Sequence, residues 1–298
     1  METVYLTHNQ NQVFLDIEPC VMVLGFFDGV HIGHQCVIHT AKKIAEEKNV
    51  ELAAITFFPH PKEILNHVEK PFRYITPMSD KEETLAGLGI DKLYVIEFNR
   101  ELAALPPKSF IEHYVIGLNA VHVVAGFDFT YGNKGEGNMD TIGLDGNGRF
   151  QVTKVQKVTC GDQKISSTLI RETLGKGEVE KIPDYLGDFY ETQGEILIDT
   201  IIQEKGKVRA YLTTKPGYTL PSIGWYSIEV FFLHQIFAGT SSVQLLDNGV
   251  VVNEIELEGF KPKDNNTLLK IKWLNRIDEC ENKNPVNKNR LREFSTSF

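Results

Sequence analysis

Two histidines, His31 and His34, stand where a short apolar run at 21–24 passes into an amphipathic segment at 35–48. A strand that runs through a glycine-containing turn into a helix is typical of a phosphate site. The first helical turn offers unpaired N–H groups and a partial positive charge, and glycine lets the backbone approach the ligand. Residues three apart share one helix face, so both imidazoles can contact the same anion. A partial zinc site or two surface histidines are the alternatives that this spacing leaves open.

A second group of polar residues lies far downstream, where residues 164–171 read Lys-Ile-Ser-Ser-Thr-Leu-Ile-Arg. Ser167 or Thr168 can cap a helix by accepting hydrogen bonds from its first N–H groups. Arg171 then lies one turn further along, where its planar guanidinium can bind two phosphate oxygens. An ordinary capped surface helix would look the same, so this segment predicts phosphate binding only in combination with the histidines.

Together the two segments resemble the signature motifs of the nucleotidylyltransferase superfamily, whose members attack the α-phosphate of a nucleoside triphosphate and release pyrophosphate. The run Gly-Phe-Phe-Asp-Gly-Val-His-Ile-Gly-His at 25–34 is similar to that of the adenylyltransferase module of bacterial FAD synthetases. The resemblance implies catalytic roles for His31, His34 and Arg171, and Mg²⁺ that accompanies ATP. The residues that it implies for ATP and phosphate binding are Gly25, Phe26, Asp28, Gly29, Gly33, Ser166, Ser167 and Thr168.

Two further loops match the same family. The sequence Phe-Phe-Pro-His-Pro at 57–61 follows a strand-like run, and its prolines fix a rigid loop at the carboxyl end of that strand, where ligands of parallel sheets bind. A stiff loop with an exposed histidine is the alternative. The sequence Gly-Phe-Asp-Phe-Thr-Tyr-Gly at 126–132 opens a glycine-rich loop that either covers a substrate, with Phe127, Phe129 and Tyr131 lining a ring slot, or is mobile. The flavin or substrate contacts that the resemblance implies are Phe58, Pro59, His60, Pro61, Phe127 and Asp128.

The composition indicates an enzyme that acts on small molecules. The 298 residues include 31 Lys and Arg against 40 Asp and Glu, and the net charge of −9 disfavours a nucleic-acid partner. No apolar run reaches the roughly 18 residues of a membrane helix, and the first residues lack the pattern of a signal peptide. The cysteines are widely separated, which argues against disulfides and structural zinc. We expect a cytoplasmic protein with no membrane partner and no metal of its own, and a homo-oligomer stays open.

The N-terminal part alternates strand-like and helix-like segments. Strands are predicted near 21–24, 52–57, 93–96, 121–125 and 151–158, and helices near 35–48, 80–88 and 110–116. Ser79 with Glu82 and Ser109 with Glu112 each have the spacing of a capping box. This alternation predicts an α/β fold with a parallel sheet covered on both faces. The resemblance implies its Rossmann-like form.

After residues 186 and 187 the pattern changes to short strands separated by turn residues such as Asp-Asn-Gly at 247–249. The predicted strands are 194–198, 208–212, 226–232, 243–246, 250–257 and 268–273, which favour a small antiparallel β-barrel. The polar stretch 281–290 is typical of a solvated connector. The predicted domains are therefore 1–186, a nucleotidylyltransferase domain, and 187–298, a β-barrel.

The order of these domains resembles that of bacterial FAD synthetases that also carry a riboflavin kinase barrel. That kinase has the run Gly-Phe-Pro-Thr-Ala-Asn, whose Thr and Asn hold Mg-ATP, and no such run follows Gly194. The sequence Leu-Pro-Ser-Ile-Gly-Trp-Tyr at 220–226 still resembles the framework of the barrel. The resemblance implies that either Glu254 or Glu256 takes the place of the kinase's general base, and it does not choose between them. The resemblance implies a kinase-like barrel without kinase activity.

The predicted function is adenylyl transfer from ATP to FMN, which gives FAD and pyrophosphate. One alternative is a nucleotidylyltransferase with a different acceptor, or a relative of class I aminoacyl-tRNA synthetases, which also use a His-Ile-Gly-His motif. The acidic charge and the absence of a Lys-Met-Ser-Lys-Ser loop argue against the synthetase. The other alternative is a flavin-binding regulatory protein without catalysis.

Overall fold

The computed structural model describes residues 1–8, 17–65, 72–197, 200–245, 251–261 and 268–278. The chain divides into two compact units, Met1–Ser167 and Thr168–Phe298, which are described separately below. This division falls inside the predicted first domain, and the functional boundary after residue 186 stays a prediction. The turn predicted at 247–249 and the connector predicted at 281–290 lie outside the described residues.

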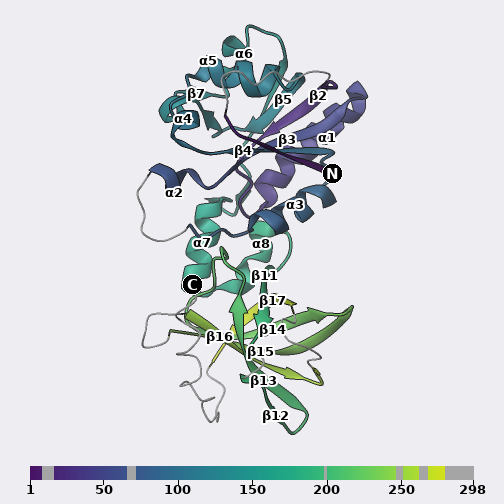
Figure 1. Ribbon diagram of the computed structural model, residues 1–298, viewed down its shortest axis with the longest axis vertical. Coiled ribbons are helices and arrows are strands. Elements are labelled where there is room, and N and C mark those ends of the chain that lie inside the picture. Colours follow the sequence, from purple (N-terminus) through teal and green to yellow (C-terminus); the bar gives the residue numbers. More distant parts are fainter. Residues whose placement is uncertain (9–16, 66–71, 198–199, 246–250, 262–267, 279–298) are drawn as a thin grey trace. The chain divides into compact units, whose positions relative to one another are not determined.

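A six-stranded, wholly parallel sheet forms the centre of the first unit (Figure 1). In spatial order its strands are β1, β4, β3, β2, β5 and β8. The central strands are almost completely buried because both faces of the sheet are covered, as parallel sheets require. Their bounds are β1 Glu2–Leu6, β2 Cys20–Leu24, β3 Glu51–Phe58, β4 Lys92–Glu97, β5 Ala120–Gly126 and β8 Gln151–Val155.

Alternate residues of β2 enter two different cores. Val21 and Val23 pack with the buried face of α1 (Ile32–Lys48), whereas Met22 and Leu24 share a core with Phe110. Phe110 ends α5 (Pro107–Phe110), which continues as a π-helical turn over Ile111–Ile116. The remaining short helices of this unit are α2 Pro61–Leu65, α3 Met78–Gly87, α4 Arg100–Ala103 and α6 Ile142–Asp145.

The structure confirms the predicted α/β class and corrects several local predictions. Both capping boxes are wrong: α3 begins after Pro77 and α5 after Pro106, so each helix starts one to two residues before the serine that was to cap it. Proline at these positions suits a helix start because its φ is already helical. The glycine-rich segment after β5 is also more regular than predicted, because it contains α6 and the short strands β6 (Thr130–Tyr131) and β7 (Gly137–Asn138).

The second unit is built around the predicted antiparallel barrel. Six strands close in the order β11, β17, β14, β15, β16 and β13, because β11 pairs with β13 as well as with β17, and β12 extends the sheet beyond β13 (Figure 1). The interior holds Trp273, whose indole N–H donates to the Thr192 hydroxyl at 3.0 Å. The strands are β11 Tyr190–Ile196, β12 Ile202–Glu204, β13 Lys207–Thr214, β14 Gly224–Phe232, β15 Gln235–Leu245, β16 Val251–Glu258 and β17 Leu268–Ile277.

The chain order places β2 and β5 at a switch point of the parallel sheet. From β2 the chain continues through β3 and β4 on one side, and it then returns to β5 and β8 on the other side. The loops that follow β2 and β5 therefore diverge at the carboxyl edge of the sheet. This is the position at which open α/β sheets bind their ligands.

Candidate nucleotide site at the switch point of the parallel sheet

The loop between β2 and α1 follows an unusual backbone path. Phe27, Gly29 and Val30 all have positive φ, at 54°, 86° and 39°. Val30 is β-branched and strained in this region, so the surrounding contacts must hold it there. A Cβ on Gly33 would also come within 3.1 Å of the His31 ring, so the ring packs closely over this glycine.

Asp28 holds this loop in place. Its carboxylate is buried and accepts hydrogen bonds from the backbone N–H groups of Ile75 (3.0 Å) and Thr76 (3.2 Å). Its carbonyl oxygen accepts a hydrogen bond of 2.8 Å from the Ser167 hydroxyl. The loop is thus tied both to the segment before α3 and to the Ser-Ser-Thr segment, two regions distant in sequence. Direct contact between Asp28 and a nucleotide stays a prediction.

His31 and His34 face each other at the start of α1. His31 is the N-cap residue, and its Nδ1 accepts a hydrogen bond of 3.2 Å from the backbone N–H of His34. Their rings stack with centroids 3.6 Å apart and an interplanar angle of 14°. Because Nδ1 of His31 is an acceptor, the proton of its neutral ring lies on Nε2.

Both imidazoles are neutral near pH 7. Burial lowers the pKa of His31 to about 4. Burial, followed by the charges of His31, Lys81 and Lys164, holds the pKa of His34 well below its usual value. The Nδ1 atom of His34 is buried and has no hydrogen-bond partner among the described residues. A buried polar atom of this kind requires a partner that the ligand could supply.

Lys81, on α3, is a site residue that the sequence motifs do not include. Its side chain is fully buried, its Nζ donates to the Phe26 carbonyl at 2.9 Å, and burial lowers its pKa to about 8. The Thr56 hydroxyl donates to the same carbonyl at 2.9 Å. Lys81 therefore fixes the start of the histidine loop and adds a positive charge near His34. The only signal in the sequence was a polar residue at a buried position of an amphipathic helix.

The predicted Phe-Phe-Pro-His-Pro loop packs beside the start of the histidine loop. The His60 ring contacts Phe26 (4.4 Å between centroids) and stacks on Phe72 (3.8 Å), and Tyr74 lies against the same group. His60 is therefore packed among aromatic rings and its Nδ1 accepts from the Lys62 N–H at 3.0 Å. Phe58 is 41% exposed, and Pro59 follows it through a cis peptide bond. Flavin contacts of Phe58, Pro59, His60 and Pro61 stay a prediction.

The loop after β5 contributes an exposed aromatic ring and an ion pair. Phe127 is 36% exposed, Asp128 pairs with Lys164, and the Lys164 ammonium lies 4.7 Å from the centre of the Phe127 ring. Tyr131, by contrast, is buried and stacks on Phe110, and its hydroxyl donates to Asp145 at 2.7 Å. The prediction that Tyr131 lines a ring slot is therefore wrong. Its neighbour Phe129 packs partly against the same core.

The predicted second phosphate motif extends over the division between the two units. Ser166 and Ser167 belong to the first unit, and α7 (Ser167–Lys176) carries Thr168 and Arg171 into the second. The hydrogen bond from the Ser167 hydroxyl to the Asp28 carbonyl oxygen places Ser167 beside the histidine loop. The phosphate contacts of Ser166, Thr168 and Arg171 stay predictions.

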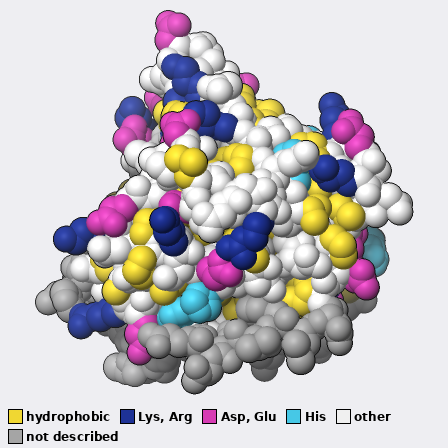
Figure 2. All heavy atoms as spheres, turned by 90° about the horizontal axis from the view of Figure 1, so that it is seen from above, with side chains coloured by type: hydrophobic (Ala, Val, Ile, Leu, Met, Phe, Trp, Pro, Cys, Tyr) yellow, Lys and Arg dark blue, Asp and Glu magenta, His cyan; other side chains and the backbone are white. Residues whose placement is uncertain are grey.

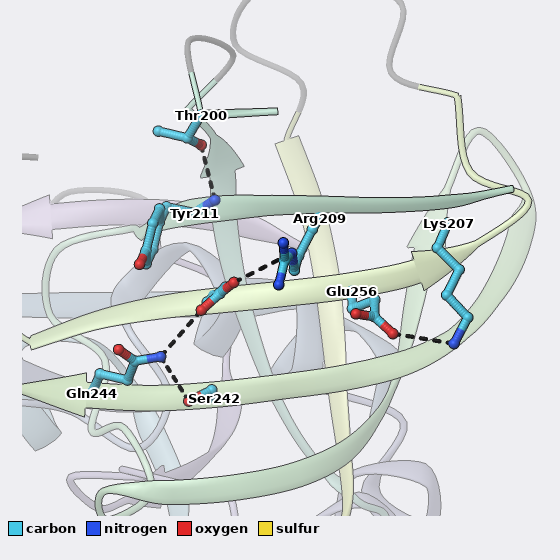
Figure 3. A network of polar contacts seen from close by, with 8 residues as sticks. Thr200, Lys207, Arg209, Tyr211, Ser242, Gln244 and Glu256 are labelled. Atoms are coloured by element: carbon cyan, nitrogen blue, oxygen red, sulfur yellow. Dashed lines mark hydrogen bonds and ion pairs between the residues drawn. The ribbon is translucent and has the colours of Figure 1, made fainter. Parts of the chain in front are cut away.

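A second polar cluster lies on β13, β15 and β16 of the barrel (Figure 3). Glu254 pairs with Arg209 at 3.7 Å between Oε1 and Nε, and its Oε2 accepts from Gln244 at 3.2 Å. Gln244 also donates to the Ser242 hydroxyl at 3.0 Å. The Arg209 and Glu254 side chains are only 13% and 9% exposed. Glu256 instead pairs with the exposed Lys207 at 3.2 Å, so the two glutamates occupy different surroundings.

Charged side chains of both signs are interspersed on the face shown in Figure 2. Among the described residues, no group of three or more His, Cys, Asp or Glu side chains could hold a metal ion. The described helices are all too short or too polar to cross a membrane. The expected absence of nucleic-acid, membrane and protein-bound metal partners stays a prediction.

A strained loop with two neutral histidines at the switch point of a parallel sheet, followed by a closed barrel, defines a nucleotide-binding α/β protein. The family model described as FAD synthetase matches residues 15–169. The chain belongs to the FAD synthetase family of enzymes, and its second unit is the kinase-like barrel of that family.

Several relatives share most of this chain. A bifunctional riboflavin kinase/FMN adenylyltransferase of Bacillus subtilis is 38% identical over 93% of this chain and 90% of its own length. A protein of Listeria monocytogenes with the same name is 40% identical over 82% of this chain and 78% of its own. A second Listeria protein, named FAD synthetase alone, is 32% identical over 77% of this chain and 87% of its own. A crystal structure titled macrolide-efflux protein from Streptococcus pneumoniae is similar with a TM-score of 0.80 and 26% identity, over 93% of this chain and all of that one.

Proposed function

We propose that the protein transfers the adenylyl group of ATP to FMN and so forms FAD and pyrophosphate. The observation that carries this proposal is the stacked pair of neutral imidazoles, His31 and His34, at the N-terminus of α1. Membership of the FAD synthetase family and the names of its relatives support the choice of FMN as acceptor.

In this reaction a phosphate oxygen of FMN attacks the α-phosphorus of ATP, and the bond from that phosphorus to the oxygen bridging to the β-phosphorus breaks. Negative charge grows on the leaving pyrophosphate. Donors that already point at this charge lower the barrier because they need no reorganisation. His31 donates from Nε2 while neutral, since its Nδ1 is engaged by the backbone of His34. The first turn of α1 adds its dipole.

Mg²⁺ enters this proposal as part of the substrate Mg-ATP. The described residues contain no carboxylate cluster that fits a resident ion, so we assign no protein ligands to it. The work assigned to the protein is therefore positioning, hydrogen bonding and compensation of charge.

The test is to incubate the full chain with ATP, Mg²⁺ and FMN, and to follow FAD and pyrophosphate together. Equal amounts of both products are expected. Pyrophosphate without FAD, when other acceptors are supplied, would favour a different nucleotidylyltransferase. Tight flavin binding without either product would favour the regulatory protein.

We also propose that the barrel does not phosphorylate riboflavin. The sequence lacks the Pro-Thr-Ala-Asn run, and a γ-phosphate that is neither positioned nor neutralised is a poor phosphoryl donor. The carboxylate of Glu254 is also engaged by Arg209 and Gln244, which disfavours its action as a base.

Riboflavin, ATP and Mg²⁺ should therefore yield no FMN, while FMN supplied separately serves as the positive control for FAD formation. Steady FMN production at a rate comparable to FAD synthesis would contradict this second proposal. The bifunctional names of two relatives describe those proteins and make this control essential.

A further inference from the structure

Lys164 lies beside the histidines although neither signature motif assigns it a task. It ends the short strand β10 (Gln163–Lys164) and directly precedes Ile165, whose carbonyl oxygen would lie 4.0 Å from a Cβ added to Gly33. Its charge contributes to the lowered pKa of both His31 and His34. The ammonium group therefore stands close to the point where a nucleotide phosphate would contact the imidazoles.

The partner of Lys164 in the structure is a carboxylate that can be replaced. Asp128 and Lys164 form an ion pair whose side chains are 54% and 40% exposed. An exposed pair of this kind contributes little stability because water screens it. A polyphosphate carries several negative charges and offers more oxygens, so it can displace a single carboxylate from the ammonium.

Lys81 is the other lysine whose charge acts on His34, but its ammonium group is not accessible to a polyphosphate in this structure. Its side chain has no exposed surface, and its Nζ is bound to the Phe26 carbonyl. Lys164, in contrast, reaches solvent, and the Phe127 ring under its ammonium keeps it on this side of the site. Lys81 therefore stabilises the histidine loop, whereas Lys164 is the lysine that can contact a ligand.

We propose that Lys164 is a phosphate-binding residue that exchanges Asp128 for an oxygen of the nucleotide's polyphosphate. Asp128 is then its counter-ion in the substrate-free protein and competes with the ligand. This inference rests on the proposed adenylyl transfer, because it assumes that polyphosphate binds beside the histidines. It assigns a role to the first residue of the second segment, for which the resemblance implied none, and predicts an energetic coupling between Lys164 and Asp128.

The experiment measures binding of inorganic pyrophosphate to the full chain by calorimetry, without FMN. Lys164→Met should weaken binding about tenfold or more, the usual size for loss of a charge-assisted contact. Asp128→Asn should tighten binding about two- to fivefold by removing the competitor. In the Lys164→Met background Asp128→Asn should have no such effect. Lys164→Arg should retain most of the binding.

The matched control is Lys154→Met, because Lys154 is paired with Asp140 in the same unit and is similarly exposed. Its pyrophosphate affinity should equal that of the wild type. Wild-type affinity in Lys164→Met would overturn the inference, and so would an equal effect of Asp128→Asn with and without Lys164. Neither result would contradict the proposed adenylyl transfer. If the wild type binds neither pyrophosphate nor ATP, the proposed function fails together with it.

Discussion

The two units each contain a cation paired with a carboxylate, and the surroundings of the two pairs differ. In the first unit Lys164 and Asp128 are 40% and 54% exposed, and the charge of Lys164 acts on both neutral histidines. In the barrel Arg209 and Glu254 are 13% and 9% exposed, and Gln244 and Ser242 complete their network (Figure 3). The first pair is accessible to a ligand, whereas Arg209, Glu254, Gln244 and Ser242 are largely shielded and contact one another.

The two pairs therefore differ in how accessible their charged groups are to a ligand. At the candidate site the His31 Nδ1 is held by the His34 backbone, and the His34 Nδ1 is buried without a hydrogen-bond partner among the described residues. Arg209 and Glu254 form a largely buried ion pair, so removal of one partner should lower the stability of the barrel. Four measurements test whether the two pairs differ in this way.

The largest effect is expected at the histidines. His31→Ala or His34→Ala should lower kcat of FAD synthesis by roughly 10² to 10³, because each removes an oriented donor or its support next to the developing charge. Steady-state kinetics with ATP and FMN give the values, and circular dichroism checks the fold. Turnover within a factor of three of wild type in both variants would remove the histidines from the mechanism.

The next effect should appear in the barrel, as stability. Arg209→Met leaves the Glu254 carboxylate nearly buried without its cation, which should cost about 2–3 kcal/mol of unfolding free energy. FAD synthesis should be unchanged. The double variant with Glu254→Gln should recover much of the loss, since no charge remains. Lys164→Met should cost less than about 1 kcal/mol.

Urea unfolding of the wild type, Arg209→Met, the double variant and Lys164→Met measures these differences in unfolding free energy. Equal losses for Arg209→Met and Lys164→Met would mean that exposure does not separate the two pairs.

Acid should destabilise the first unit through His31. Its folded pKa of about 4 lies below the usual 6.5, so the unfolded chain binds the proton more readily between these values. Stability is full above pH 6.5 and falls as the pH drops towards 4, by about 2 kcal/mol at pH 5. His31→Asn should lose this part of the pH dependence in urea unfolding at pH 7 and pH 5. His39→Asn, an exposed position on the same helix, should behave as the wild type.

The smallest effect is expected at Arg171. Kinetics of a variant at this position test whether the second unit contributes to catalysis. Arg171→Lys should lower kcat/KM for ATP about tenfold, because an ammonium cannot reproduce the planar fork of guanidinium on phosphate. The melting temperature should stay unchanged. A large drop in melting temperature with wild-type kinetics would indicate that Arg171 serves the helix instead.

The sequence predicted the strands β2 to β5 well because they are continuous apolar runs. It also located six barrel strands because turn residues separate them, but the predicted strand 243–246 reaches only the end of β15, and β12 was not predicted. It did not predict β1, an edge strand with only one buried residue, since half-exposed edges carry no continuous hydrophobic signal. The capping boxes failed because proline fixes a helix start more strongly than serine chemistry does.

The motifs located the loop of His31 and the segment of Ser167, which the structure brings together through Asp28. They did not include Lys81, and they implied no role for Lys164. A buried lysine is recognised only when its neighbours are known, and pairing with Asp128 depends on the sheet order, which places β5 beside β2.

That sheet order also bears on how the protein acquires its site during folding. Cys20 of β2 pairs with Glu51 in β3, a nearby part of the chain, but with Ala120 in β5 on its other side. Closing the longer loop costs more chain entropy before any contact compensates for it, so pairing of β5 is expected to be a late step. The loop that carries Asp128 follows β5, so it takes its place in the site only after β5 has paired. In refolding experiments, recovery of pyrophosphate binding should therefore follow formation of α1 and the first strands, and a chain released before β5 has folded should have helices but no site.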